Sequence, residues 1–551
     1  MTMQRRRWAR AGLLVAGYAA LSLWVTWPLP ARLGTSLAGD YGDPVFVSWV
    51  MAWVADHLTA VLRGDLAAWG AMWDAPIFWP ERSTLAYSEH FLAQSLQSLP
   101  IWWATRNPLL GYNVVYLATM TLTAVAAHGL AVRLSGRQIA GVVAALTCTL
   151  NDYRTFWSLS HLHTLSIHWW IFGLWGLDVF IATGSRPALA GATASLIALH
   201  LSSNYLMAFC APFTAIFAVW SLARHGRLAD IGRWTGVVAA GLVSVLAVLP
   251  VVLRYLATRE GLGFSRSILE TSASSASIAA YAQALPWIAP LVLLALVGAL
   301  APSVADQVSR RARLGLLAMA AAAIVLSFGP VISLDGQTYR GPYLLLRYVP
   351  GFEGLRVPHR FVTIAATLLA LLAGFGAAWL ARWRVALVAV AVAVALVTRT
   401  GWQPPFPIDG VLTFAPLAAP PPYLRPAAAT PAIYRFLATT PADAVLAELP
   451  FGDLGYEVRY TFFTQAHRRR TLNGYSGVLP PSYEARVRAL TAPLGEPETA
   501  WRALTPASHV IVHAAAWPDD TGARVMAWLE EHGARELVEV EGARLYELPP
   551  H

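Results

Sequence analysis

The 551-residue chain contains no lysine, only two cysteines and few charged residues of any kind, 13% of the total. Cys148 and Cys210 both lie within apolar runs, so neither a disulfide framework nor a cysteine metal cluster is expected. The sequence also lacks a Gly-rich nucleotide loop, a nucleophile elbow and paired CxxC motifs. These absences argue against cytoplasmic chemistry on a soluble nucleotide sugar.

What the chain has instead is apolar residues, which make up 56% of it and give a mean hydropathy of +0.50. This composition is too apolar for a soluble globular protein and too polar for a chain immersed wholly in lipid. The net charge of +9 comes from arginines that fall mainly between the apolar runs, where the positive-inside rule places them. We therefore expect a polytopic α-helical membrane protein with extramembrane residues, and no nucleic-acid partner.

About eleven apolar runs are long enough, or nearly so, to cross a bilayer. They are residues 11–28, 114–132, 139–150, 165–183, 188–201, 205–223, 235–255, 287–301, 314–331, 361–380 and 385–397. The first run follows a basic stretch that should stay in the cytoplasm. An uncleaved first helix is favoured over a cleaved signal peptide, because no A-x-A-like site follows the run and many further spans do.

The arginines of alternate loops all fall on the cytoplasmic side if the N-terminus is cytoplasmic. They are Arg133, Arg137, Arg186, Arg224, Arg227, Arg233, Arg310, Arg311, Arg313, Arg382 and Arg384. The odd number of spans then places the C-terminus on the periplasmic face of a bacterial inner membrane.

Two further segments, residues 45–62 and 91–103, are apolar but interrupted or short. We predict that they are amphipathic helices along the outer surface, with tryptophans at the interface: Trp49, Trp53, Trp102 and Trp103.

The predicted organisation has three parts. Residues 1–400 form a membrane domain whose long first outer loop, residues 31–110, carries the surface helices. Residues 401–430 form a stiff Pro-rich linker, and residues 431–551 form a small periplasmic α/β domain. In that domain, helices are expected over residues 431–439 and 522–532, the second stopped by Gly533 as a C-cap. Strands are expected at "AVLAEL", "HVIVHA" and "RELVEV".

The stretch "AGDYGDPVFVSWVMAW" places two carboxylates in front of an apolar, Trp-rich helix. Asp43 and Pro44 have a structural explanation, since Asp is a preferred N-cap and Pro is favoured at the first helical position. On spacing alone this explanation is favoured over a catalytic one. Asp40, however, has no such structural role. Two outward-facing carboxylates at the mouth of a first span could deprotonate an acceptor hydroxyl or hold a divalent cation such as Mg²⁺ or Mn²⁺.

The order of these parts resembles the GT-C superfamily of membrane glycosyltransferases. The shared features are a basic cytoplasmic start, one span, an acidic motif opening a long outer loop, many further spans and a C-terminal outer α/β domain. More narrowly, "GDPVFVSWVMAW", "LAYSEH", "LRVPHRF" and "LNGYSG" are similar to motifs of a large group of bacterial GT-C-like membrane proteins. The resemblance covers most of the chain. It implies transfer of a sugar from a polyprenyl phosphate or diphosphate to an outer-face lipid, polysaccharide or protein.

In this superfamily, the acid that follows the first span activates the acceptor or binds a metal. By that resemblance, Asp43 is the best match and Asp40 the second. Proline follows Asp43 where the aminoarabinose and mannosyl transferases commonly have an acid. This departure weakens the case for metal binding and for activity.

The motif "GLRVPHRF" places Arg356, His359 and Arg360 just outside the predicted span 361–380. Arginine forks match phosphate oxygens, so this group could grip a lipid-linked phosphate leaving group at the outer headgroup level. Its position departs from the positive-inside bias, which favours a functional role. Arg340 and Arg347 lie in the same loop and could assist.

Six further residues could contact the acceptor, although each also has a structural explanation: Asp152, Arg154, Glu89, His90, His161 and His163. "NDYR" offers a second acid or a solvated helix end, and neither is favoured. The histidines of "SHLHTLSIHWW" lack the i, i+4 spacing of a helical metal pair and are better explained as interfacial or core residues. "SEH" is better explained as an ordinary loop. Asp178 lies near a cytoplasmic helix end and is given no role.

Two other functions stay open. A transporter or flippase would carry polar groups deep in its spans, whereas these are dominated by Ala, Val and Leu, with His168 and His200 as exceptions. A non-catalytic GT-C-like protein would use its C-terminal domain to bind envelope partners. A membrane glycosyltransferase that uses a lipid-linked sugar is the leading prediction.

Overall fold

The computed structural model describes residues 3–151, 153–302, 308–383, 404–412, 417–420 and 430–550. The chain divides into two compact units. Unit 1 comprises Met1–Trp27 and Tyr116–Pro405, and unit 2 comprises Pro28–Val115 and Phe406–His551. The first long loop is thus grouped with the C-terminal residues.

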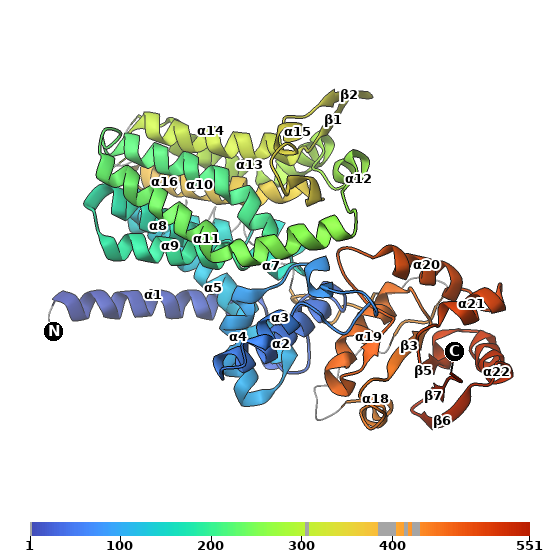
Figure 1. The fold of residues 1–551 in the computed structure, drawn as a ribbon. Helices are drawn as coiled ribbons and strands as arrows, with labels where there is room; N and C mark the ends of the chain where they lie inside the picture. The colour runs from blue at the N-terminus through green and yellow to red at the C-terminus, as the bar shows by residue number, and fades with distance from the viewer. Residues whose placement is uncertain are drawn as a thin grey trace. The chain divides into compact units, whose positions relative to one another are not determined.

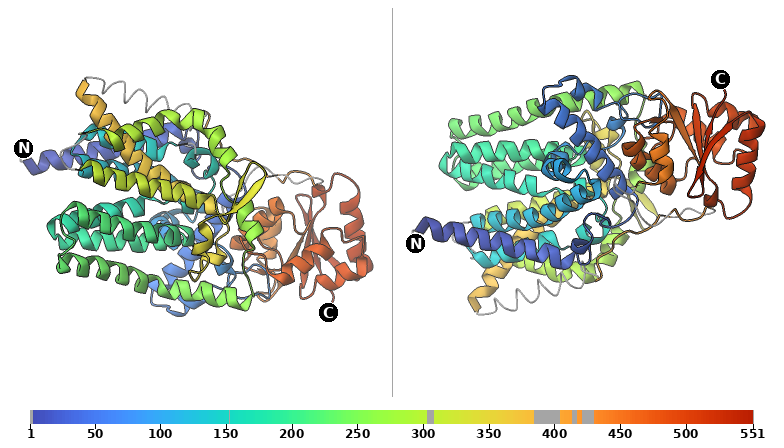
Figure 2. Two further views of the ribbon diagram at one scale, coloured as in Figure 1. Left: turned by 90° about the horizontal axis from the view of Figure 1, so that it is seen from above. Right: turned by 90° about the horizontal axis from the view of Figure 1, so that it is seen from below.

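Unit 1 is mostly helical (Figure 1). Its longer helices are α1 (Met3–Val25), α5 (Pro108–Ser135, which begins in unit 2), α6 (Gln138–Thr149), α8 (His168–Thr183), α9 (Arg186–His200), α10 (Asn204–Arg224), α11 (Ile231–Gly261), α13 (Ile278–Leu300), α14 (Arg310–Ser327) and α16 (Val362–Leu380). Between them lie a π-helical turn (Tyr153–Trp157), α7 (Leu162–Leu165), α12 (Ile268–Ala273), the hairpin of β1 (Val331–Leu334) and β2 (Gln337–Arg340), and α15 (Tyr343–Leu346). Both views of Figure 2 agree with Figure 1 that α8, α9 and α11 lie side by side.

Seven helices in the described ranges are long and apolar enough to cross a membrane, or eight if the bent pair within 268–300 is one span. The predicted spans at 139–150 and 188–201 fall on α6 and α9, which have only 12 and 15 residues. The run at 385–397 lies outside the described residues. Conversely, α2 (Asp43–Leu62), predicted as a surface helix, is long and apolar enough to span. The chain is a multi-pass membrane protein, while the count of about eleven spans stays a prediction.

Glycines allow the closest helix contacts of unit 1. A Cβ at Gly298 of α13 would overlap the carbonyl oxygen of Leu372 in α16, and a Cβ at Gly374 would overlap that of Ala140 in α6. Small residues let helix backbones approach directly, as is typical of membrane helix pairs. Helix α16 therefore packs on both α13 and α6, with most of its residues buried.

A buried ion network ties three helices of unit 1 together. Asp178 of α8 is fully buried and accepts hydrogen bonds from Arg133 Nε of α5 at 2.9 Å and Arg224 Nη2 of α10 at 2.7 Å. Ser221 Oγ of α10 donates to the same carboxylate at 2.8 Å. A buried carboxylate that lost such partners would strongly destabilise the fold. Asp178, for which no role is predicted from the sequence, is thus a structural residue.

Unit 2 contains a five-stranded sheet with the order β4-β3-β5-β7-β6. Its strands are β3 (Val445–Leu449), β4 (Arg470–Thr471), β5 (His509–His513), β6 (Arg535–Val540) and β7 (Ala543–Glu547). β3 pairs in parallel with β4 and β5, while β7 pairs antiparallel with β5 and β6. Figures 1 and 2 place this sheet between α19 (Leu454–His467) on one side and α22 (Thr521–Glu531) on the other.

The remaining helices of unit 2 are α2, α3 (Ala67–Ala71), α4 (Leu92–Thr105), α18 (Ala432–Leu437), α20 (Pro481–Leu490) and α21 (Pro497–Ala503). The three predicted strands correspond to β3, β5 and β6, and the two predicted helices to α18 and α22. Gly533 follows α22 with a φ of +85°, as a left-handed C-terminal residue should. The sheet is present, while a separate C-terminal domain stays a prediction.

Helix α2 packs on α19 within unit 2. Trp49 is only 1% exposed, and its Nε1 donates to Thr464 Oγ1 of α19 at 2.8 Å. Farther along, the backbone of the first loop pairs with the end of β4, where the Phe78 N–H donates to the Asn473 carbonyl at 2.9 Å. Trp49 and Trp102 were expected to face the membrane interface, but both are buried in unit 2. Trp103 is 50% exposed.

Candidate active site

Asp43 is the first residue of α2, and Gly42 is its N-cap. The interpretation of Asp43 as the N-cap is therefore wrong by one position, although Pro44 lies in the first turn as expected. The half-buried carboxylate of Asp43 accepts a hydrogen bond at Oδ1 from the Tyr475 hydroxyl, at 2.7 Å. Its position in the first turn also suits a negative charge, because the helix dipole is positive there. Asp43 thus has a specific side-chain partner from a distant part of the chain.

Asp40 shapes the turn that leads into α2. Its Oδ1 accepts a hydrogen bond from the Gly42 N–H at 2.8 Å, the pattern of an Asx turn. The neighbouring backbone pairs with a later segment, since the Tyr41 N–H donates to the Gly410 carbonyl at 2.7 Å. Asp40 therefore has the structural role that the sequence alone does not reveal.

Tyr475 belongs to the "LNGYSG" motif, which a buried carboxylate holds in place. Glu457 of α19 accepts hydrogen bonds from the Gly474 N–H at 2.8 Å, Asn473 Nδ2 at 3.0 Å and the Gly452 N–H at 2.8 Å. Burial raises the pKa of Glu457 to about 8, against the opposing effect of these donors. Because Glu457 fixes the two residues before Tyr475, it determines where the tyrosine hydroxyl lies.

Aromatic rings support the same contact. The ring of Tyr475 packs against Phe46, one turn after Asp43, with centroids 5.4 Å apart. Phe46 in turn stacks on Trp49 at 5.7 Å. The aromatic face of α2 predicted from the sequence therefore lies against residues of unit 2 and positions Tyr475.

The "LAYSEH" motif lies beside "LNGYSG" in unit 2. A Cβ at Gly477 would lie 3.4 Å from the carbonyl oxygen of Tyr87, so the two backbones nearly touch. Glu89 and His90 are both buried. His90 Nδ1 accepts a hydrogen bond from the Leu92 N–H at 3.2 Å at the start of α4, and burial lowers the pKa of His90 to about 3. A neutral, buried His90 fits the ordinary-loop interpretation better than contact with an acceptor.

A second polar cluster lies in unit 1, around Tyr205 of α10. The Arg360 guanidinium sits 4.0 Å from the centre of the Tyr205 ring, and the Arg356 N–H donates to the Tyr205 hydroxyl at 3.0 Å. The ring of His163 is 6.5 Å from Tyr205. Glu270 lies 2.5 Å from Arg266 Nη1 and 4.0 Å from Arg356 Nη1.

The structure thus brings together two predicted groups, "SHLHT" and "LRVPHRF". His161 also belongs here, because its ring lies 5.7 Å from that of His163. Tyr205, Arg266 and Glu270 were missed from the sequence, since nothing local marks them as partners of these motifs. With three arginines and one carboxylate, the Tyr205 cluster suits an anionic ligand.

The other predicted residues have different surroundings. His359 packs edge-on against Tyr153 at 5.3 Å. Arg154 is buried and donates to the Leu165 carbonyl at 3.0 Å and to Thr123 Oγ1 at 3.4 Å, so it braces the turn that contains it. Arg347 donates to the Arg266 carbonyl at 3.0 Å. Arg340 is exposed on β2, and Asp152 lies outside the described residues.

No group of three or more His, Cys, Asp or Glu side chains in the described part of the chain gathers as a metal site would. Asp40 and Asp43 each accept a hydrogen bond from a protein donor. These two carboxylates alone do not form a preorganised cation site, which usually needs six or more oxygen ligands, some from water.

No family model matches the sequence, and no curated protein matches it. Among solved structures, the chain is similar to the arabinofuranosyltransferase AftD from Mycobacteria, with a TM-score of 0.62 and 14% identity over 99% of this chain and 40% of that chain. It is also similar to ArnT from Cupriavidus metallidurans bound to undecaprenyl phosphate, with a TM-score of 0.49 and 12% identity over 98% of this chain and 99% of that chain. For ArnT in the apo state the TM-score is 0.47, with 12% identity over 98% of this chain and 100% of that chain.

The likeness to AftD shows the fold. The chain has the fold of the GT-C membrane glycosyltransferases, and the resemblance predicted from the sequence motifs is confirmed at that level. The chain spans about 40% of the length of AftD.

Proposed function

We propose that the protein is a membrane glycosyltransferase that moves one sugar from a polyprenyl-phosphate-linked donor to an acceptor hydroxyl on the periplasmic face. The observation that carries this proposal is the contact between Asp43 and Tyr475, because it joins two of the motifs that resemble the GT-C proteins. The fold supports the same class of reaction, and the neighbour AftD is described as an arabinofuranosyltransferase.

In the proposed reaction, Asp43 is the general base. Its carboxylate accepts the proton of the acceptor hydroxyl while that oxygen forms a bond to the anomeric carbon of the donor. The bond from the anomeric carbon to the phosphate oxygen breaks, and the phosphate leaves with its electron pair. Tyr475 is a positioning residue, since its hydroxyl bond to Oδ1 fixes the orientation of the base. In unit 1, Arg356 and Arg360 of the Tyr205 cluster are the residues proposed to bind the phosphate of the lipid-linked donor.

These steps assign no role to a divalent cation. If one is bound, Asp43 and Asp40 are the residues that would hold it, and it would supply charge neutralisation during sugar transfer.

The proposed topology follows the arginine pattern, with about eleven spans, a cytoplasmic N-terminus and periplasmic C-terminal residues 431–551. Alkaline phosphatase and green fluorescent protein fusions after Arg227 and after residue 550 test it. Phosphatase activity only at the second position is expected, and activity at the first would overturn the orientation.

Transfer of a labelled sugar from lipid-linked donors in membranes tests the reaction. We expect Asp43→Asn to lower the rate by at least about 100-fold, the usual loss when a general base is removed. Asp65→Asn is the matched control, because Asp65 is an exposed acid just after α2 whose carboxylate accepts a local hydrogen bond from the Ala67 N–H. Unchanged transfer by the Asp40→Asn, Asp43→Asn double variant would overturn the assignment.

A further inference from the structure

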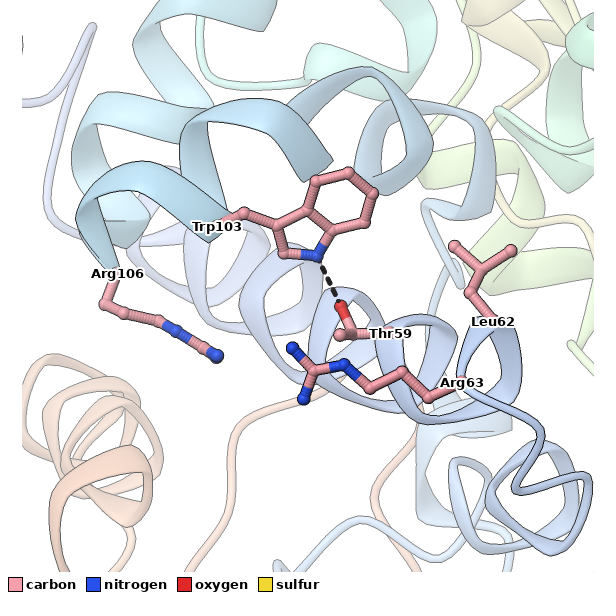
Figure 3. A pocket seen from close by; sticks show the side chains of 5 residues that line it. All are labelled: Thr59, Leu62, Arg63, Trp103 and Arg106. Atoms are coloured by element: carbon pink, nitrogen blue, oxygen red, sulfur yellow. Dashed lines mark hydrogen bonds between the residues drawn. The ribbon is translucent and has the colours of Figure 1, made fainter.

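A hollow of about 360 Å³ lies between the C-terminal turn of α2 and the end of α4 (Figure 3). It is lined by Thr59, Leu62, Arg63, Trp103 and Arg106. Thr59 is sixteen residues beyond Asp43 on the same helix, about 24 Å away at 1.5 Å per residue. The hollow is therefore separate from the candidate active site.

The hollow carries excess positive charge. Figure 3 shows the guanidinium groups of Arg63 and Arg106 pointing toward one another from opposite sides. Arg106 pairs with Asp56 at 2.6 Å, but that carboxylate also binds Arg468 at 2.8 Å. The Arg63 side chain makes no ion pair or hydrogen bond with any described residue. Arg106 and Arg468 thus share one carboxylate, while the Arg63 charge has no counterion among the described residues, and two facing arginines suit an anion between them.

The same hollow has an apolar rim. Leu62 is 66% exposed and Trp103 is 50% exposed. The Trp103 ring is held in place, because its Nε1 donates to Thr59 Oγ1 at 2.8 Å (Figure 3). Leu66 and Trp69, which follow α2, are exposed as well. Exposed tryptophan and leucine beside arginine are typical of a surface that meets the headgroup region of a bilayer.

The chain itself puts this hollow near the membrane surface. Arg106 lies two residues before α5 (Pro108–Ser135), which is long and apolar enough to span. The first turn of a spanning helix lies at the level of the lipid headgroups. The residues just before it, Trp103 and Arg106, therefore lie at that level too, whichever side of the membrane it is.

We propose that this hollow binds the phosphate of an anionic phospholipid headgroup of the surrounding bilayer. Arg63 and Arg106 hold the phosphate oxygens, while Leu62 and Trp103 contact the glycerol and upper acyl chains. The site tethers the α2–α4 pair to the membrane surface, independently of whether the protein transfers sugar.

Native mass spectrometry of the purified full-length protein in detergent tests the site, with phosphatidylglycerol and phosphatidylcholine added in turn. We expect phosphatidylglycerol to bind at least about tenfold more tightly, because both lipids carry a phosphate but the choline ammonium of phosphatidylcholine places a further positive charge beside the two arginines. Arg63→Gln should remove that preference without affecting folding, because Arg63 has no partner to lose in the described structure. Arg524→Gln is the control, since Arg524 is an exposed arginine of α22 away from the hollow.

Three results would overturn the proposal. They are equal affinity for the two lipids, a phosphatidylglycerol preference that survives in Arg63→Gln, and displacement of the lipid by inorganic phosphate at comparable concentration. The last would mean that the hollow recognises free phosphate. Trp103→Ala is a second test. Loss of the apolar rim should weaken the binding of phosphatidylglycerol several-fold while leaving both arginines in place.

Discussion

At the scale of single residues, the candidate active site depends on a hydrogen bond between residues 432 positions apart. Local rules explain why a helix begins beside Asp43, because Pro44 suits the first turn. They do not identify its partner, since no rule of spacing links Asp43 to Tyr475. The motif "LNGYSG" marks the right segment, and only the folded chain shows which of its residues reaches the acid.

Tyr475→Phe removes the hydroxyl that orients Asp43 and keeps the ring that packs on Phe46. We expect kcat to fall roughly 10- to 100-fold, since the bond of a hydroxyl to a carboxylate is worth roughly 1.5–3 kcal/mol. The KM for the donor should change little, and the unfolding temperature should fall by only a few degrees, so that the variant stays folded during the assay. A variant with full kcat would show that Tyr475 does not position Asp43.

Glu457 makes the fold of unit 2 sensitive to pH. Its pKa is raised from 4.5 to about 8 by burial, so the folded protein keeps a proton that the unfolded chain releases. This stabilisation is fully present below pH 4.5 and is lost as the pH rises through 8. The unfolding temperature of the wild type should therefore fall between those two pH values, and that of Glu457→Gln should fall less.

The measurement is intrinsic fluorescence during heating, at several pH values, for the wild type and Glu457→Gln. Glu531→Gln serves as the control, because Glu531 is an exposed glutamate at the end of α22. The curves of the wild type and Glu457→Gln should diverge with pH, whereas the control should run parallel to the wild type. Parallel curves for all three would mean that Glu457 ionises normally in the folded protein.

At the scale of helices and strands, elements with clear local signals are predictable. α22 has a periodic apolar face and a glycine after its end, and β5 is a short apolar run. α19 was missed because its buried face includes Glu457, Arg459 and other polar residues. Its burial comes from contacts with α2 and the "LNGYSG" loop, which lie elsewhere in the sequence.

Gly298→Ala tests the close contact between α13 and α16. The added Cβ would overlap the Leu372 carbonyl, so the helices must separate. Overpacking of this kind costs about 1–3 kcal/mol, or roughly 5 °C in unfolding temperature. Gly241→Ala on α11 is the control, since a Cβ there would meet nothing within 4 Å and should cost nothing. Equal unfolding temperatures for the two variants would contradict this packing.

At the scale of the whole molecule, the grouping of the first long loop with the C-terminal residues is the feature least accessible from sequence. Hydropathy marks where apolar runs begin and end, but it cannot show that Trp49 bonds to Thr464 or that Phe78 pairs with Asn473. Three of the four family-like motifs meet in unit 2, and the fourth, "LRVPHRF", lies in unit 1.

Truncation after residue 403 tests this grouping. Val50 of α2 is fully buried, one turn beyond Phe46, so Val50→Cys should resist maleimide in the full-length protein. Without the C-terminal residues, α2 loses α19, and labelling should become at least about tenfold faster. Cys148 and Cys210 are buried in unit 1 and stay unlabelled if that unit is intact, which separates local exposure from general unfolding. Asp65→Cys, at an exposed position, should label equally in both proteins. Continued protection of position 50 after truncation would mean that the first loop folds without the C-terminal residues.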